Sequence, residues 1–192
     1  MTKSRCGWVT NDPDYLAYHD EEWGVPCFDR QRLFEMLCLE GQQAGLSWIT
    51  VLKKRDAYRR AFYQFIPEKV AEISAETVGM LLQSPELIRN KLKINAIINN
   101  AQALLAMEAQ GEEFVNVIWQ TVSHHPLHQS YTDYRQAPVR SPQSESLSKE
   151  LKKRGFKFVG PIICHAYMQA CGLIIDHQVN CFKYLETNKS LG

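Results

Sequence analysis

The sequence lacks any long hydrophobic segment. Among its 192 residues, no apolar run approaches the ~18 residues that a membrane-spanning helix needs. The first ten residues are polar and include Arg5 and Gly7, so no export signal is recognised and we expect a cytoplasmic protein. In that compartment, the six irregularly spaced cysteines are expected to be reduced thiols or metal ligands rather than a disulfide framework.

A strong net charge is also missing, since the formal charge is only +1. Any contact with nucleic acid must therefore come from local basic clusters and not from the overall field. Two such clusters occur, one with Lys53, Lys54, Arg55, Arg59 and Arg60, and one with Lys149, Lys152, Lys153, Arg154 and Lys157. Each cluster could equally be the solvated face of a helix.

Strand patterns are scarce, and internal repeats and low-complexity tracts are not found. The apolar content of 45% and the aromatic content of 10% are typical of a packed globular protein. A chain of this length can form one domain over residues 1–192, or two helical lobes with a pocket between them. We therefore expect an all-α fold.

Helix signals recur along the chain. Asp29 can cap a helix with an apolar stripe at Leu33, Phe34, Leu37 and Cys38. The other signals predict a helix after Ser47 that buries Val51, Leu52, Tyr58 and Phe62, short helices starting at Pro67 and at Ser84-Pro85, and helices over 92–107, 113–122, 144–154 and 161–171. Residues 124–143, which are polar and contain three prolines, predict a long surface connection.

Two pairs of possible zinc ligands lie at opposite ends of the sequence: Cys6 with His19, and His177 with Cys181. Zinc prefers four tetrahedral nitrogen or sulfur ligands, and a His-x3-Cys spacing would bring two of them onto one side of a helical turn. A site of this kind would tie the two ends of the chain together and stabilise the fold by binding only the folded state. From spacing alone, each residue could also be an ordinary partly buried side chain.

A basic segment over residues 151–164 predicts a phosphate-binding hairpin. A helix rich in lysine ends at Gly155, a short turn with Lys157 follows, and Val159-Gly160-Pro161 opens the next helix. Gly160 permits close approach of a ligand to the backbone, and the free amides of the helix start favour an anion. This is the layout of a helix-hairpin-helix element that holds a DNA phosphate, although a plain helix-turn-helix packing unit has a similar pattern.

The first fifty residues are dense in large aromatic side chains, and a single acid, Glu40, lies among them on an otherwise apolar helix. Aromatic residues usually form the core, and a helical glutamate usually faces water. The functional interpretation is a pocket whose rings stack on an extruded base while the carboxylate binds the edge of that base. Such rings also attract a cationic base. The aromatic residues are Trp8, Tyr15, Tyr18, Trp23 and Trp48.

Several ordered motifs make the sequence similar to the 3-methyladenine DNA glycosylase I family, over roughly residues 5 to 181. They are Arg5-Cys6-Gly7-Trp8, Tyr18-His19-Asp20, Glu22-Trp23-Gly24-Val25-Pro26, Leu39-Glu40-Gly41-Gln42-Gln43-Ala44-Gly45-Leu46-Ser47-Trp48, Lys153-Arg154-Gly155-Phe156-Lys157-Phe158-Val159-Gly160 and Met168-Gln169-Ala170-Cys171-Gly172-Leu173.

The resemblance implies a helix-hairpin-helix glycosylase fold that excises 3-methyladenine from alkylated double-stranded DNA and leaves an abasic site. It implies a structural Zn2+ bound by Cys6, His19, His177 and Cys181. Glu40 and Tyr18 would be catalytic, and Trp8, Tyr15, Trp23 and Trp48 would bind the base. Gly45 and Leu46 would fill the gap left by the flipped nucleotide, while Lys157, Val159 and Gly160 would hold the flanking backbone.

No lysine occurs in the segment from Leu39 to Trp48, so we expect a monofunctional enzyme without lyase activity. A monomer is expected by analogy, because a bent duplex needs one broad face. 3-Methylguanine is a possible minor substrate. Two other readings stay open at this point: a non-catalytic binder of damaged DNA, and a zinc-stabilised interaction module.

Two positions qualify the resemblance. At Ala166 we expect a small hydroxyl residue in many relatives, so this chain could lack one polar contact to the base. The wider superfamily uses an aspartate downstream of the hairpin. The nearest candidate, Asp176, adjoins the proposed ligand His177, and we assign it no catalytic role.

Overall fold

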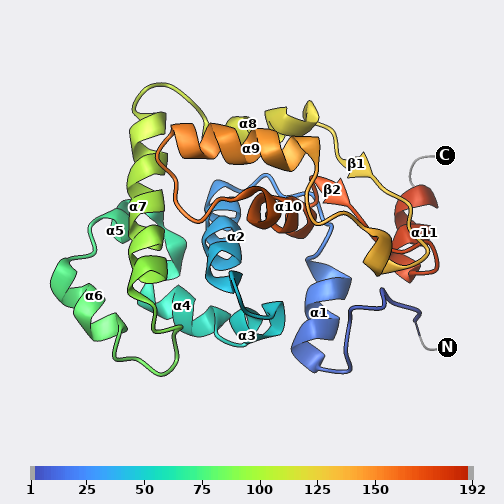
Figure 1. Ribbon diagram of the computed structural model, residues 1–192, viewed down its shortest axis with the longest axis horizontal. Coiled ribbons are helices and arrows are strands. Elements are labelled where there is room, and N and C mark those ends of the chain that lie inside the picture. Colours follow the sequence, from blue (N-terminus) through green and yellow to red (C-terminus); the bar gives the residue numbers. More distant parts are fainter. Residues whose placement is uncertain (1–2, 190–192) are drawn as a thin grey trace.

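The computed structural model describes residues 3–189 and is mostly helical, as predicted (Figure 1). The first described residues, before α1, and the last described helix, α11, lie at the same side of the molecule in this view. The elements are α1 (Pro13–Glu21), α2 (Arg30–Gln43), α3 (Trp48–Leu52), α4 (Arg55–Ala61), η1 (Tyr63–Phe65), α5 (Pro67–Ala71), α6 (Ala75–Leu81), α7 (Lys91–Glu108), α8 (Phe114–Trp119), η2 (Gln120–Val122), β1 (Leu127–His128), η3 (Tyr134–Gln136), α9 (Pro142–Lys153), α10 (Pro161–Ala170), β2 (Ile174–Ile175) and α11 (Phe182–Lys189).

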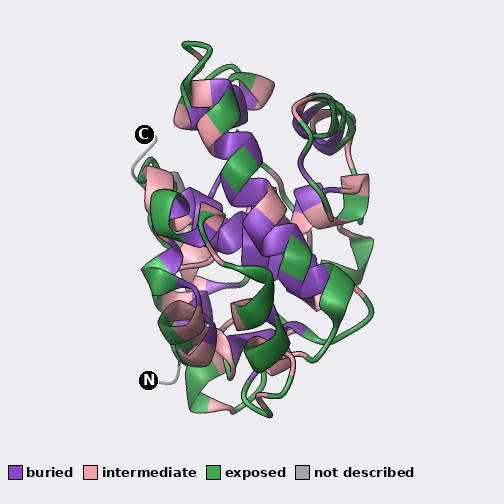
Figure 2. Ribbon diagram, turned by 90° about the vertical axis from the view of Figure 1, so that its left-hand side faces the viewer, coloured by how far each residue is buried: buried purple, intermediate pink, exposed green. Residues whose placement is uncertain are grey.

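Helix α2 forms the centre of the core. Every residue from 33 to 42 is buried, because α7 and α10 both pack against this helix, and α9 in turn covers α10. Figure 2 shows these buried segments in the interior of the molecule, with exposed residues on the outer helices. Full burial of one large apolar side chain stabilises a fold by about 1.5–3 kcal/mol, so this packing holds α2 rigidly.

The predicted cap of α2 is confirmed, since an Asp29 carboxylate oxygen accepts a hydrogen bond from the Arg32 amide at 2.7 Å. Ser47 does precede a helix, but its hydroxyl contacts Thr50 Oγ1 at 2.8 Å and makes no cap bond to the backbone. The helix predicted after Ser47 is interrupted: α3 ends at Leu52, and α4 begins only at Arg55. The buried positions predicted for it are nevertheless correct.

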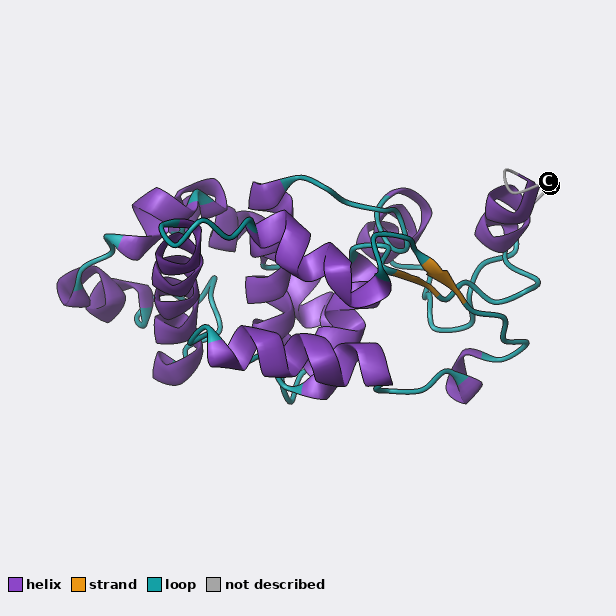
Figure 3. Cartoon of the chain, turned by 90° about the horizontal axis from the view of Figure 1, so that it is seen from above, coloured by secondary structure: helices purple, strands orange, loops and turns teal. Residues whose placement is uncertain are grey.

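Other expectations are wrong in informative ways. Ser84-Pro85 starts only a turn. Two helices that were not predicted, α1 and α6, do form, and Ser74 caps α6. The connection at 124–143 contains η3, the first residues of α9 and a short strand. That strand, β1, pairs in parallel with β2 through Leu127↔Ile174 and His128↔Ile175 (Figure 3). Two residues are too few for an alternating pattern to reveal a strand.

The described part of the chain contains no candidate membrane-spanning helix. No helix there combines the length and the apolar character that crossing a bilayer requires.

Candidate active site and metal centre

A cavity of about 300 Å3 lies between the α1–α3 region and α10. All six residues that the sequence predicts for a base pocket line it, although they come from four separate segments. These residues are Trp8, Tyr15, Tyr18, Trp23, Glu40 and Trp48. The structure therefore brings the predicted set together in one place.

Glu40 is the central acid of this cavity. It lies on α2 and is only 3% exposed, and its Oε2 atom has no hydrogen-bond partner among residues 3–189. Burial opposes ionisation and raises the pKa of Glu40 to about 8. A buried, unpaired carboxyl group destabilises a fold, and such groups concentrate at functional sites.

Aromatic rings surround the carboxyl group. The Tyr18 and Trp48 rings lie 5.3 Å apart between centroids, and Trp8 contacts both Tyr15 at 5.2 Å and Trp23 at 5.1 Å. The indole Nε1 of Trp48 is buried without a partner among the described residues. Burial, with a smaller contribution from Glu40, holds the pKa of Tyr18 well above its usual value, so its hydroxyl stays protonated.

The opposite wall of the cavity contains two residues that the sequence did not reveal, His165 and Gln169, and Asp176, to which no role was assigned. His165 and Gln169 lie one turn apart on α10, and Gln169 Nε2 donates to Asp176 Oδ2 at 2.6 Å. Asp176 Oδ1 and His165 Nε2 are buried without partners in the described part of the chain. Burial raises the pKa of Asp176 and lowers the pKa of His165. The i, i+4 spacing of two polar residues on an apolar helix was the signal that could have identified this wall.

Further lining residues come from η3 and the segment that follows it, and from α10 and α2. Ala166 also lines the cavity, so its methyl group takes the place where we expected a hydroxyl in relatives. The complete set of these additional residues is Gln43, Tyr134, Ala137, Pro138, Val139, Ile162 and Ala166.

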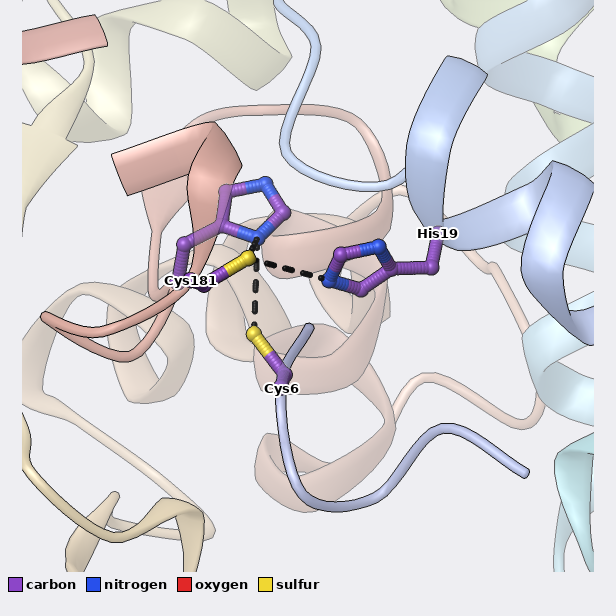
Figure 4. Close-up of side chains that lie close together, drawn as sticks. Cys6, His19 and Cys181 are labelled. Carbon is purple, nitrogen blue, oxygen red and sulfur yellow. Dashed lines mark hydrogen bonds between the residues drawn. The ribbon is translucent and has the colours of Figure 1, made fainter. Parts of the chain in front are cut away.

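The four predicted zinc ligands form one buried cluster. Their ligand atoms all lie within 4.8 Å of one another. Cys6 Sγ is 3.5 Å from His177 Nδ1, and Cys181 Sγ is 3.5 Å from His19 Nε2; Figure 4 shows Cys6, His19 and Cys181 pointing toward one another. A tetrahedral zinc ion with Zn–S of 2.3 Å and Zn–N of about 2.0 Å gives sulfur–nitrogen edges of ~3.5 Å, so the donor set fits this metal.

Neighbouring groups support the cluster. His19 Nδ1 is 2.8 Å from Asp20 Oδ1, and Arg5 in turn binds Asp20, so the imidazole is oriented with Nε2 toward the cluster. The contact between the two thiols lowers the pKa of Cys181, with help from the two imidazoles, and raises the pKa of Cys6, so Cys181 is the thiol that ionises first. One detail of the prediction is wrong: His177 and Cys181 lie in the turn before α11 and not on a helix.

Two tryptophans separate the cluster from the cavity. Trp23 packs edge-on against His177 at a centroid distance of 4.7 Å, and Trp8 packs against His19 at 5.4 Å. Both tryptophans also line the cavity. The metal centre and the candidate active site therefore share a wall.

The predicted hairpin lies between α9 and α10. Gly155 has a positive φ of 87°, α10 begins after Gly160, and no side chain caps its first amides. Lys157 is exposed, whereas the Val159 side chain is buried, so only the backbone of Val159 can contact a ligand. A Cβ atom at Gly41 would lie 3.2 Å from Phe158 Cβ, so glycine lets the hairpin pack tightly on α2 beside Glu40.

The two basic clusters differ. In the cluster at 53–60, each of four cations has an acidic partner: Lys53 with Asp12, Arg55 with Glu22, Arg59 with Glu35 and Arg60 with Glu86. This cluster is therefore largely neutralised within the protein. In the second cluster, Arg154 binds Glu112 and Glu150, while Lys149, Lys152, Lys153 and Lys157 are exposed. Only the second cluster offers a basic surface.

The turn after α2 projects from the protein. Gly45 has a φ of 78°, and no atom lies within 4 Å of its ideal Cβ position. The Leu46 side chain is 41% exposed. Both residues lie close in sequence to Glu40 and Trp48, at the end of the helix that contributes Glu40 to the cavity.

Comparisons with known proteins agree with this arrangement. The DNA-3-methyladenine glycosylase 1 of Escherichia coli (strain K12) is 57% identical over 180 residues, which are 94% of this chain and 96% of the relative. A crystal structure of a 3-methyladenine DNA glycosylase I matches with a TM-score of 0.92 at 55% identity and covers 93% of this chain and 98% of the other.

A second solved structure concerns 3-methyladenine recognition by the 3-methyladenine DNA glycosylase I of Staphylococcus aureus. It matches with a TM-score of 0.89 at 40% identity, and the match covers 93% of this chain and 95% of the other. The family model described as methyladenine glycosylase matches residues 8–184, which include the entire cavity lining and three of the four residues of the metal cluster, while Cys6 lies two residues before the matched range. The chain therefore belongs to the methyladenine glycosylase family.

Proposed function

We propose that this protein is a DNA repair glycosylase that hydrolyses the N-glycosyl bond of 3-methyladenine in alkylated double-stranded DNA. The observation that carries this proposal is Glu40, a buried carboxyl group with an unpartnered oxygen inside an aromatic cavity of about 300 Å3. A methylated purine supplies both a flat ring for the aromatic side chains and a cationic edge for the acid. The names of the family relatives point to the same substrate.

The chemistry needs little acid catalysis. N3-methylation leaves adenine cationic, so its bond to deoxyribose is already weakened and the base departs neutral. The duplex must first release the nucleotide into the cavity, where Tyr18 and Trp48 bind the ring and Glu40 accepts hydrogen bonds from the adenine edge. A cationic base next to Glu40 lowers the pKa of its buried carboxyl group and so favours the carboxylate, which complements the positive charge of the base. Water then attacks the anomeric carbon of an oxocarbenium-like sugar.

The product is an intact strand with an abasic site. A lyase step would need an amine that forms a Schiff base with the sugar. Within residues 3–189, none of the side chains that line the cavity is a lysine. We therefore infer a monofunctional glycosylase. 3-Methylguanine differs from 3-methyladenine at the edge that Glu40 would bind, and we expect its excision to be slower.

The hairpin and the turn after α2 would bind DNA on either side of the cavity. Backbone amides around Val159 and Gly160, at the start of α10, are suited to a phosphate, and Lys157 adds attraction that is independent of sequence. The exposed Gly45-Leu46 turn would fill the gap left in the duplex. One broad face would then contact the DNA, as expected for a monomer.

The Cys6, His19, His177 and Cys181 cluster would hold a structural Zn2+. When bound, the ion supplies four bonds that connect the N-terminal segment to the turn before α11. The residues themselves keep Trp8 and Trp23 in place through ring contacts with His19 and His177. No step of base removal uses these ligands directly.

The test is release of free bases from N-methylated duplex DNA by the purified protein, separated by chromatography, with Glu40→Gln as the matched control. We expect release of 3-methyladenine, much less 3-methylguanine and little 7-methylguanine. If the folded protein binds abasic duplex but releases no base, it is a damage-binding protein. If it neither releases bases nor binds abasic duplex, it is an interaction module. Strand nicking without added base or amine would refute the monofunctional assignment.

A further inference from the structure

Lys93 is a buried cation with no assigned role. It lies in the first turn of α7, is only 7% exposed, and its ammonium group donates to the carbonyl oxygens of Gln42 at 2.7 Å and Ala44 at 2.6 Å. These carbonyls belong to the end of α2, directly before the Gly45-Leu46 turn. Lysine is almost never fully buried unless it is paired, so this placement has a specific cause.

The end of a helix leaves carbonyl oxygens without partners inside the helix. At the end of α2 the backbone departs abruptly, because Ala44 is extended, with φ −45° and ψ 114°. The Lys93 ammonium satisfies two carbonyls at this point, and a positive charge is favourable there because the C-terminal end of a helix is negative. Lys93 thereby fixes the residue that precedes Gly45.

The turn itself has few other restraints. Leu46 is exposed and no atom lies within 4 Å of the ideal Cβ position of Gly45; a backbone bond from the Leu46 amide to the Gln43 carbonyl, at 2.6 Å, closes the turn. An apolar residue that enters duplex DNA must hold its position while it displaces stacked bases. If folding already orders the turn, its conformational entropy does not have to be lost when DNA binds, and binding is tighter.

A second set of bonds links the same helices without touching the turn. Gln42 Nε2 donates to the Lys93 carbonyl at 3.0 Å, and the Tyr58 hydroxyl donates to Gln42 Oε1 at 3.0 Å. Tyr58 is fully buried and thus belongs to the core. Loss of its hydroxyl would disturb the α2–α7 contact but leave both carbonyl bonds of the Lys93 ammonium in place.

We propose that Lys93 is a positioning residue that preorganises the Gly45-Leu46 turn for insertion into duplex DNA. The proposal rests on the proposed function, because it assumes that this turn enters the gap beside a flipped nucleotide. Lys93 acts through the backbone of Gln42 and Ala44 and touches neither the base nor the sugar. It should therefore affect duplex distortion and not recognition of the free base.

The experiment compares Lys93→Met with Tyr58→Phe as the matched control. Three quantities are measured: affinity for free 3-methyladenine by tryptophan fluorescence, affinity for a duplex with an abasic-site analogue, and the fluorescence of 2-aminopurine placed beside that site. We expect Lys93→Met to weaken duplex binding about tenfold or more and to reduce the 2-aminopurine signal, with free-base affinity changed less than about twofold. Tyr58→Phe should lower the melting temperature but keep duplex affinity.

A double-mutant cycle separates positioning from general stability. Leu46→Ala alone should weaken duplex binding, and Lys93→Met should then add little in the Leu46→Ala background, because both changes remove the same interaction. Lys93→Arg keeps the charge and should retain part of the affinity even if Lys93→Met folds poorly. Additive effects of Lys93→Met and Leu46→Ala, or wild-type duplex affinity in Lys93→Met, would overturn the proposal.

Failure of the proposed function looks different. A wild-type protein that binds abasic duplex through Leu46 and Lys93 but releases no base would leave the positioning role intact and remove the enzymatic one. Normal excision by wild-type protein, combined with unchanged duplex binding in both Leu46→Ala and Lys93→Met, would support the enzymatic function and refute the positioning role of Lys93.

Discussion

Two buried polar sites lie on either side of Trp8 and Trp23, and they differ in how their polar atoms are satisfied. In the metal cluster, the ligand atoms of all four residues converge on one point, within 4.8 Å of one another. In the cavity, Glu40 and Asp176 each leave a buried oxygen without a partner among the described residues. The donor set of the cluster suits a metal ion that would be held within the fold, whereas the polar atoms of the cavity would be satisfied by a molecule that enters from outside. Changes in the two sites should therefore have opposite effects on stability.

The largest effect is expected at the cluster. If the cluster holds the proposed zinc ion, Cys181→Ser removes a ligand to a metal that binds only the folded state, and we expect the free energy of unfolding to fall by several kcal/mol, about 3–5. Thermal melting of the metal-loaded protein, with and without a strong chelator, measures this. Cys27→Ser, at a half-buried thiol outside the cluster, is the control and should cost about 1 kcal/mol or less. Equal losses in the two variants, or a chelator without effect, would contradict a structural metal.

The next effect is on catalysis at the cavity. Glu40→Gln keeps the shape of the side chain but removes the charge that complements a cationic base, so single-turnover excision of 3-methyladenine should fall about 100-fold or more. Glu35→Gln, at a buried acid on the same helix that is paired with Arg59 and does not line the cavity, is the control and should change the rate much less. An unchanged rate in Glu40→Gln would make Glu40 a structural acid.

The same variant should be more stable than wild type at neutral pH. Because the folded-state pKa of Glu40 is about 8 and the ordinary value is 4.5, the folded protein keeps a proton that the unfolded chain releases between these pH values. The stability contribution of Glu40 thus falls as the pH rises from 4.5 to 8. Glu40→Gln should gain up to about 4 kcal/mol at pH 7.5 and nothing at pH 4, as measured by urea unfolding. If Glu40→Gln were less stable than wild type at pH 7.5, the cavity and the metal cluster would not respond to substitution in opposite directions.

The smallest effect extends the comparison to the surface, where cations are paired in one cluster and exposed in the other. Lys157→Gln should weaken binding to abasic duplex slightly and reduce the slope of log K against log salt by about 1. Lys54, whose Nζ donates to the Pro85 carbonyl at 2.8 Å, supplies the control variant Lys54→Gln, which should leave the slope unchanged. If Lys157→Gln and Lys54→Gln gave the same slope of log K against log salt, the DNA would not contact the cluster that contains Lys157.

Sequence reasoning located much of the fold from local signals. The α2 cap at Asp29 and the long α7 were predictable, because each rests on contacts within a few residues. The interruption between α3 and α4 was not, since the buried positions Val51, Leu52, Tyr58 and Phe62 fit one continuous helix as well as two. The β1–β2 pair joins segments almost fifty residues apart and carries no local pattern.

The site was predictable to a different extent. The density of aromatic residues around Glu40 suggested a pocket, with an ordinary core as the alternative, and the family resemblance favoured the pocket. The spacing of these residues in the sequence does not by itself show that they meet. On the opposite wall, His165 and Gln169 were missed although their i, i+4 spacing on an apolar helix is a signal, and Asp176 was considered but given no role because it adjoins His177. The cavity brings all three together with Glu40. The ion pairs that neutralise the cluster at 53–60 also depend on tertiary contacts, such as that between Arg55 and Glu22.

The close packing of Gly41 against Phe158 fixes the position of the hairpin relative to Glu40. Phe158, in the hairpin, lies against α2 at the residue that directly follows Glu40, and a side chain even as small as a methyl group would crowd this contact. If the hairpin holds a phosphate, the separation between that phosphate and the carboxylate is set within the protein core. The distance from the bound DNA phosphate to the base pocket is then fixed, and only a flipped nucleotide that spans this distance can place its base beside Glu40.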